Sequence, residues 1–215
     1  VLHTMLFDVL NQNNGYASDA MLYKYVKSKY QIFIGKNNIT SDMNLYYIVS
    51  KLFGDACDFR RPHIGVKGKF EKFSTKDVIL HMLNYPDEIS YEHYRLVAEK
   101  MAWSPVTIGM VFTEIEKDYV RTSTDKYVKS ESFWIAQDVI ADIRDRIELQ
   151  MEDGVLPLTG IDMDELPEIE YEWNEFLLES VIEIYCHSIE IIHPAIKDRR
   201  YQKGIAVLKE TNIKS

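Results

Sequence analysis

This 215-residue sequence is poor in cysteine and has no long apolar run, and each shortage excludes a class of protein. Its two cysteines, Cys57 and Cys186, stand far apart with no CxxC or Cys/His spacing, which excludes a disulfide framework and a structural zinc site. We expect both to be small buried side chains. No apolar run approaches the ~20 residues of a membrane helix, and the first residues lack the features of a signal peptide. We therefore expect a cytoplasmic protein without a membrane partner.

Catalytic signatures are missing as well. None of the patterns GxxxxGK[ST], GxSxG, HExxH and GxGxxG occurs. Cys186 and His187 are adjacent in an expected helix and point in different directions, so they form no nucleophile and base pair. The acidic residues at 162–168 do not follow the ligand order of an EF-hand, and nothing selects His93 or His193 as a ligand. We expect no enzyme activity, no cofactor and no metal site.

Positive charge becomes scarce toward the C-terminus. Residues 1–80 carry 11 Lys and Arg against 7 Asp and Glu, a net charge of +4. Residues 81–130 carry 6 against 8, a net charge of -2, and residues 131–215 carry 8 against 19, a net charge of -11. The sequence pI of about 5.2 lies below the values above ~9 that mark a dedicated nucleic-acid-binding domain. The asymmetry indicates a front part that tolerates polyanions and an acidic back part.

Apolar residues at helical spacing dominate the chain and predict a mainly α structure with small β-hairpins. Helices are expected at 2–10, 18–30 and 41–53, with a strand or loop at 32–38 and a hairpin within 59–73. The same order, three helices and then a hairpin, begins again at Thr75. Its expected elements are helices at 76–84 and 90–102, a third helix from Ser104 and Pro105, and two short strands within 118–130.

The remaining residues, 131–215, are predicted to form an acidic helical region. Residues 132–152 form one amphipathic helix, and the apolar stretch from Trp173 to Ile192 predicts a long buried helix. Between them lies an acidic connector with two prolines. Only the late run GIAVL is typical of a strand.

Residues 97–112, VAEKMAWSPVTIGMVF, have a small residue where two helices would cross, a turn at 102–104 and a second helix with an inward apolar face. This pattern resembles the helix-turn-helix of bacterial transcription regulators. By that resemblance the groove-facing stripe would hold Thr107, Gly109, Met110 and Thr113. Ala102 stands where the motif usually has glycine, which fits only if its φ is not positive. The alternative is a purely structural helix-turn-helix, which Glu114 and Glu116 favour.

Two hairpins and one helix carry the basic residues that suit phosphate contacts. The helix at 41–53 offers Asn44, Tyr47 and Lys51 on its polar side. The first hairpin carries five cations, Arg60, Arg61, Lys67, Lys69 and Lys72, and the second carries three, Arg121, Lys126 and Lys129. The alternative is that the first hairpin is simply solvated and pairs with the acidic C-terminal region.

Together these elements resemble tandem winged-helix proteins at the level of the fold. The resemblance implies one unit at 1–74, a second at 75–130 and the acidic helical region at 131–215. It implies a non-catalytic DNA-binding or transcription-regulatory protein that contacts the phosphates of duplex DNA. The acidic region is expected to pack on the two units or to mediate association, as in a homodimer. Two alternatives remain open: an adaptor whose acidic region binds a basic protein partner, and an accessory domain of a larger enzyme.

Overall fold

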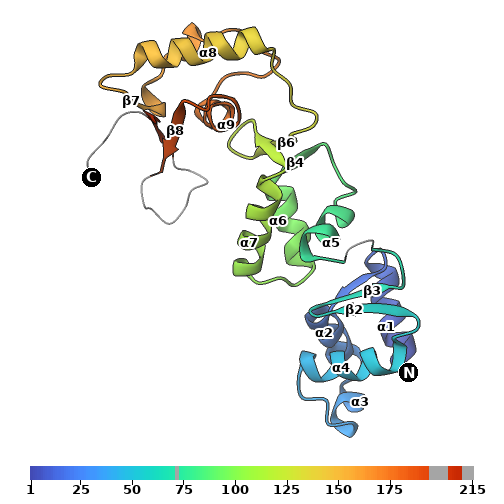
Figure 1. Ribbon diagram of the computed structural model, residues 1–215. Helices are drawn as coiled ribbons and strands as arrows, with labels where there is room; N and C mark the ends of the chain where they lie inside the picture. The colour runs from blue at the N-terminus through green and yellow to red at the C-terminus, as the bar shows by residue number, and fades with distance from the viewer. Residues whose placement is uncertain (71–72, 194–202, 210–215) are drawn as a thin grey trace. The chain divides into compact units, whose positions relative to one another are not determined.

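The computed structural model describes residues 1–70, 73–193 and 203–209, which form two compact units (Figure 1). The first unit comprises Val1–Pro86 and Glu92–Ile115, and the second comprises Asp87–Tyr91 and the chain from Glu116 onward. Helices predominate, and the strands form small antiparallel sheets of three strands each, so the expected mainly α fold class with small β elements is confirmed. In the described part of the chain, no helix has the length and apolar character needed to cross a membrane.

The first unit begins with four helices and a three-stranded sheet. The helices are α1 (Leu2–Gln12), α2 (Asp19–Lys29), α3 (Gln31–Lys36) and α4 (Asp42–Phe53), and the strands are β1 (Tyr16–Ser18), β2 (Cys57–Arg60) and β3 (His63–Val66). The sheet has the order β1-β3-β2. Apolar faces of α1, α2 and α4 form one core with β3, which explains why the helical spacing of these residues predicts the elements correctly. The strand or loop expected at 32–38 is wrong, because Gln31–Lys36 forms a short helix.

Three further helices complete the first unit: α5 (Thr75–Met82), α6 (Tyr91–Lys100) and α7 (Pro105–Glu116). They are tied to the preceding sheet by specific hydrogen bonds. The Ser18 hydroxyl donates to the Met101 carbonyl at 2.9 Å, and the Trp103 indole N–H donates to the Tyr16 hydroxyl at 3.3 Å. Both bonds are buried, so the residues after 74 help to hold the residues before it in place.

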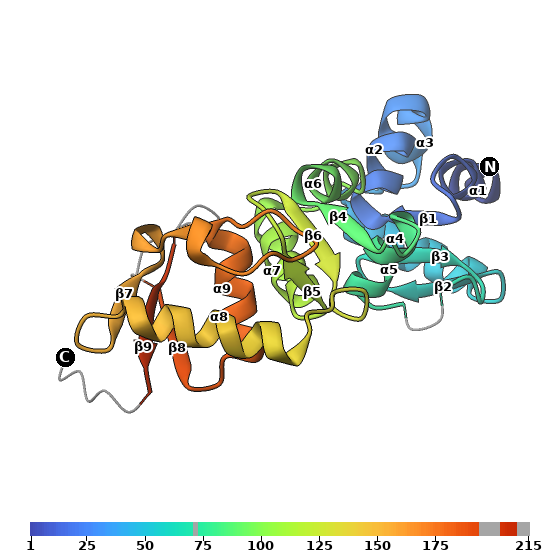
Figure 2. The same cartoon turned by 90° about the horizontal axis from the view of Figure 1, so that it is seen from above.

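The second unit contains two sheets. The first has the order β4-β6-β5, from β4 (Glu88–Ser90), β5 (Tyr119–Arg121) and β6 (Lys126–Lys129). The second has the order β7-β9-β8, from β7 (Val155–Pro157), β8 (Ile189–Ile192) and β9 (Ile205–Leu208). Figure 2 shows α8 (Gln137–Gln150) and α9 (Glu175–Tyr185) beside this second sheet. Two 3-10 turns, Leu158–Gly160 and Met163–Glu165, precede α9.

The acidic region is therefore not all helical, which corrects the prediction for 131–215. The helix expected from Trp173 to Ile192 spans only Glu175–Tyr185, because Asn174 caps its start and the chain turns at Cys186. The β-branched run Ile189–Ile192 then forms β8, since its side chains suit a sheet better than a helix. The strand expected from GIAVL is confirmed as β9.

One order of elements occurs three times along the chain. A helix is followed by a short strand, then by a helical segment, a helix and two strands, and the first strand always pairs with the last. In the third occurrence the 3-10 turns take the place of the middle helix. The helix directly before the two final strands is α4 in the first occurrence, α7 in the second and α9 in the third.

Candidate nucleic-acid interface

Helix α4 presents a polar stripe to solvent. The Ser41 side chain accepts a hydrogen bond from the Asn44 N–H at 3.1 Å, which fixes the start of the helix. Leu45, Tyr46 and Val49 face the core, so the opposite side must face solvent. That side holds Asn44, Tyr47 and Lys51, all exposed as the sequence predicts. At helical spacing these three side chains lie in one line along the helix. Two of them offer hydrogen-bonding groups, and the third carries a positive charge.

The β2–β3 hairpin lies next to α4 and carries the first basic cluster. The rings of Tyr46 on α4 and Phe59 on β2 pack edge to face with centroids 5.7 Å apart. Arg60 is exposed at the end of β2. Arg61 instead binds the Asp19 carboxylate, Nε to Oδ2 at 3.1 Å, and that carboxylate is almost fully buried. Arg61 therefore anchors the hairpin through an ion pair that partly balances its charge.

The two described lysines of the hairpin differ in their partners, and Lys72 lies outside the described residues. Lys67 lies 3.0 Å from the Asp58 carboxylate. The Gly68 N–H and the Lys67 ammonium both bind this carboxylate and lower its pKa, so it stays ionised beside the lysine. Lys69 donates to the neutral Asn14 side chain at 2.9 Å. Among the residues that the structure describes, Lys51, Arg60 and Lys69 have no carboxylate partner, and they remain the available positive charges of this face.

Helix α7, the second helix of the expected helix-turn-helix, has few side chains that suit base contacts. Both of its expected threonines form hydrogen bonds within the helix: Thr107 with the Ser104 hydroxyl at 2.9 Å and Thr113 with the Gly109 carbonyl at 3.1 Å. Ala102 in the turn has a φ of 57°, the left-handed conformation that favours glycine. The condition placed on this alanine by the resemblance is therefore not met, although α6 and α7 do flank the turn.

The three cations of the second hairpin all lie close to other protein groups. Lys126 is 3.5 Å from the Glu88 carboxylate, and Lys129 is 2.8 Å from the Glu131 carboxylate. Arg121 stacks on the Phe176 ring at 3.9 Å from its centroid and donates to the Ser123 and Thr124 carbonyls. The two lysines are thus paired with carboxylates and the arginine is held by a ring and two carbonyls, so we expect this hairpin to bind phosphate less well than the first.

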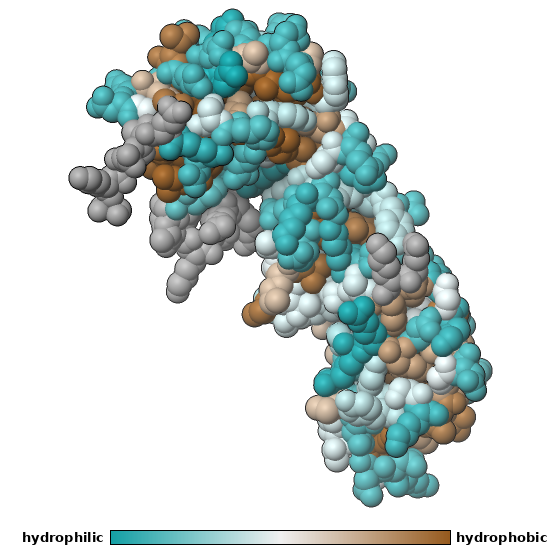
Figure 3. All heavy atoms as spheres, in the orientation of Figure 1, coloured by the Kyte–Doolittle hydropathy of each residue, from teal (hydrophilic) through white to brown (hydrophobic). Residues whose placement is uncertain are grey.

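A hollow of about 600 Å³ lies where α5 begins beside α7. It is lined by Ser74, Thr75, Lys76, Met110, Val111, Thr113 and Glu114. Two large apolar side chains of α7, Val106 and Met110, are 70% and 68% exposed. Figure 3 shows hydrophobic atoms at the surface where α7 begins. This mixture of apolar and acidic groups suits a protein surface better than a nucleic acid.

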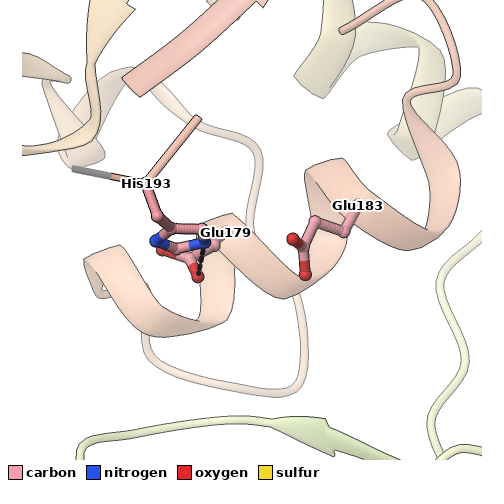
Figure 4. A group of neighbouring side chains, drawn as sticks. All are labelled: Glu179, Glu183 and His193. Carbon is pink, nitrogen blue, oxygen red and sulfur yellow. Dashed lines mark ion pairs between the residues drawn. The ribbon is translucent and has the colours of Figure 1, made fainter. Parts of the chain in front are cut away.

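A third group of side chains was not predicted from the sequence. Glu179 and Glu183, one turn apart on α9, lie near His193 at the end of β8 (Figure 4). Their ligand atoms all lie within 4.8 Å of one another. Burial raises the pKa of the Glu179 carboxyl, although His193 and Arg121 act in the opposite direction. The only sequence signal is the Glu-xxx-Glu spacing, because His193 reaches the pair through the turn after α9.

Both cysteines are free and buried, as expected, and burial raises the pKa of the Cys186 thiol to about 11. Neither thiol is therefore a reactive nucleophile near neutral pH.

No protein-family model matches the chain, and no curated protein matches it in sequence.

Proposed function

We propose that this protein binds nucleic acid without catalysing a reaction, and that it is built from repeated winged-helix units. The recurring order of helices and strands supports this fold, since a winged-helix unit places a helix before a hairpin and pairs its first strand with its last. The proposal rests on topology and on the face formed by α4 and the β2–β3 hairpin.

One observation carries the choice of the first repeat as the contact surface. Among the three helices that precede a hairpin, α4 is the one whose exposed side combines an amide, a phenol and an ammonium group beside an available arginine. Helix α7 exposes apolar groups instead, and α9 carries glutamates. Lys51, Arg60 and Lys69 would neutralise phosphates, which positions the protein without specifying a sequence.

The test is a titration of fluorescently labelled duplex DNA with the full chain at low and moderate salt. The variant Lys51→Gln with Arg60→Gln should weaken binding to all sequences and reduce the salt slope by about one per lost phosphate contact. Both side chains are exposed, so folding should change by less than ~0.5 kcal/mol.

A matched control is Lys126→Gln with Lys129→Gln, which removes the same charge from the second hairpin. Because carboxylates already balance these two lysines, the control should bind nearly as tightly as the wild type. Equal losses in the two variants would show that only net charge matters. A wild-type protein that binds no duplex at low salt would refute the proposal.

A second function, protein binding, is favoured by the exposed apolar residues of α7 beside the hollow at the start of α5. In this case the winged-helix units serve as scaffolds, and a partner covers Val106 and Met110. Replacing Met110 with Lys would abolish capture of such a partner and leave DNA affinity unchanged or slightly higher. Partner capture by this variant therefore tests the protein-binding function, and the duplex titration of the wild type tests the nucleic-acid-binding function.

A further inference from the structure

We propose that Glu179, Glu183 and His193 form a binding site for a divalent metal ion of the Zn²⁺ class. The site lies where α9 passes the end of β8, within the second unit (Figure 4). Two carboxylates and one imidazole form a mixed oxygen and nitrogen ligand set, which suits Zn²⁺ better than Mg²⁺ or Ca²⁺, because those ions prefer oxygen ligands alone.

The distances are close to those that a bound ion needs. The His193 Nε2 atom already lies 3.2 Å from the Glu179 Oε1 atom. Zinc binds such ligands at about 2.0–2.2 Å, so neighbouring ligands of a tetrahedral ion lie roughly 3.4 Å apart. All three ligand atoms lie within 4.8 Å of one another, and Glu183 is exposed. Rotation of the Glu183 side chain alone would therefore close the site, with a fourth position left for water.

The protein also holds the Glu179 carboxylate in place from the opposite side. The Gly204 N–H approaches the Glu179 Oε2 atom at 3.3 Å, so Oε1 faces His193. A side chain at position 204 would meet the Ile191 side chain at 2.3 Å, so glycine allows this close approach of the backbone. Such outer contacts orient the carboxylate ligands of metal sites.

Lys203, next to Gly204, does not compete for the site. The ammonium of Lys203 binds the Glu175 carboxylate, one turn before Glu179 on α9. This bond lowers the pKa of the Glu175 carboxyl and leaves Glu179 to His193. Arg121 lies near enough to attract Glu179, but it stacks on Phe176 and donates to two carbonyls.

A second observation concerns the ring of His193. Its Nδ1 atom is buried and, among the described residues, has no hydrogen-bond partner, so the ring's polar contact is the one that Nε2 makes with Glu179. An imidazole beside two carboxylates carries one positive charge at most against two negative charges. A divalent cation would balance both carboxylates and connect α9 to the end of β8.

The experiment is isothermal titration of the full chain with ZnCl₂ after removal of metals by a chelator, with thermal melting in parallel. We expect one ion per chain and a higher melting temperature in zinc, because an ion that binds only the folded state stabilises it. MgCl₂ at the same concentrations should produce neither effect.

Two variants locate the site and one serves as a control. Glu183→Gln should weaken zinc binding by roughly tenfold or more, in line with the loss seen when metal-site contacts are removed, and should leave the metal-free melting temperature unchanged because Glu183 is exposed. His193→Asn should weaken it similarly. Glu190→Gln removes an exposed carboxylate of β8 outside the cluster and should bind zinc as the wild type does. No zinc binding by the wild type, or equal binding by Glu183→Gln, would overturn the proposal.

Discussion

His63 on β3 is a buried base held between two hydroxyl groups. Its Nδ1 atom lies 2.9 Å from the Tyr16 hydroxyl, and its Nε2 atom lies 3.0 Å from the Thr75 hydroxyl. Because the Trp103 indole only donates, it donates to the Tyr16 oxygen, and the Tyr16 O–H is then directed at Nδ1 of His63. The neutral ring with its proton on Nε2 fits this chain of hydrogen bonds. A second proton on Nδ1 would meet the tyrosine O–H.

The first prediction concerns the pH dependence of stability. Burial, with the nearby charge of Arg60, lowers the pKa of His63 from 6.5 to about 4. Between these values the unfolded chain binds the proton and the folded chain does not, so stability falls as the pH decreases below 6.5. From pH 7 to pH 5 this histidine should account for a loss of about 2 kcal/mol. Urea unfolding at the two pH values measures it.

The control for this prediction is His63→Gln. Glutamine keeps polar atoms near both hydroxyls but does not titrate, so the variant should lose about 2 kcal/mol less than the wild type over the same pH interval. Its stability at pH 7 should already be lower, because packing and hydrogen bonds are disturbed. If both proteins lose the same free energy between pH 7 and pH 5, the pKa of His63 is not lowered in the folded state.

At the scale of elements, side-chain caps fix several helix starts. Ser18 begins α2, Ser41 begins α4 and Ser74 begins α5, each with a side chain that accepts a backbone N–H bond. Asn174 does more at the start of α9. Its side-chain oxygen accepts from the Phe176 and Leu177 N–H groups at 3.1 Å, and its amide donates to the Thr122 carbonyl at 2.8 Å. This residue therefore joins α9 to the segment after β5.

The second prediction addresses this cap. Asn174→Ala should lower the free energy of unfolding by about 1–2 kcal/mol, because two N–H groups at the helix start lose their acceptor. Asn174→Asp keeps the acceptor, adds a charge that suits a helix N-terminus and loses only the amide's bonds to the Thr122 and Glu172 carbonyls. It should therefore recover most of the loss in chemical unfolding. Equal destabilisation by the two variants would assign the effect to the bonds that the amide donates to the Thr122 and Glu172 carbonyls.

The helices could be predicted from the sequence where a capping residue stands directly before a run of apolar residues at helical spacing, as for α4 and α7. The short strands β1, β4 and β7 could not. Each has three residues, too few for a periodic pattern, and its partner lies far along the chain: Tyr16 is opposite Gly65. Strand β8 could not be predicted either, because its partner β9 comes only after a long connection. A strand of this kind is fixed by pairing rather than by its own residues.

The candidate interface was predictable only in part, for a similar reason. Exposure of Asn44, Lys51 and Arg60 follows from the local pattern. Which cations are neutralised does not, because Asp19 lies 42 residues before Arg61, its partner. The proposed metal site shows the same limit, since two glutamates at helical spacing are common and only the turn after α9 brings His193 to them.

On the scale of the whole molecule, charge is distributed unevenly over a repeated order of elements. Residues 1–80 have a net charge of +4, whereas residues 131–215 have a net charge of -11. A nucleic acid is attracted by the first group and repelled by the second. The repulsion acts over the Debye length, which is roughly 30 Å at 0.01 M salt and 8 Å at 0.15 M. Nucleic-acid binding should therefore depend on salt in two opposing ways.

The last prediction isolates the repulsive part. Glu168, Glu170 and Glu172 are exposed residues of the acidic connector before α9, and no ion pair of theirs occurs among the described residues. Replacing all three with glutamine changes the net charge of -9 to -6. If the first repeat binds duplex DNA, the triple variant should bind it on the order of two- to tenfold more tightly at 0.01 M salt, mainly through faster association.

The same titration at 0.15 M salt provides the control, because screening then removes the repulsion and the two proteins should bind equally. Stopped-flow mixing at low salt should assign the gain to the association rate, since no glutamate is removed from the contact surface itself. A gain that persists unchanged at 0.15 M would place the connector directly against the nucleic acid. An unchanged affinity at 0.01 M would show that the acidic region does not oppose binding, and its charge would then have to be explained by a basic protein partner.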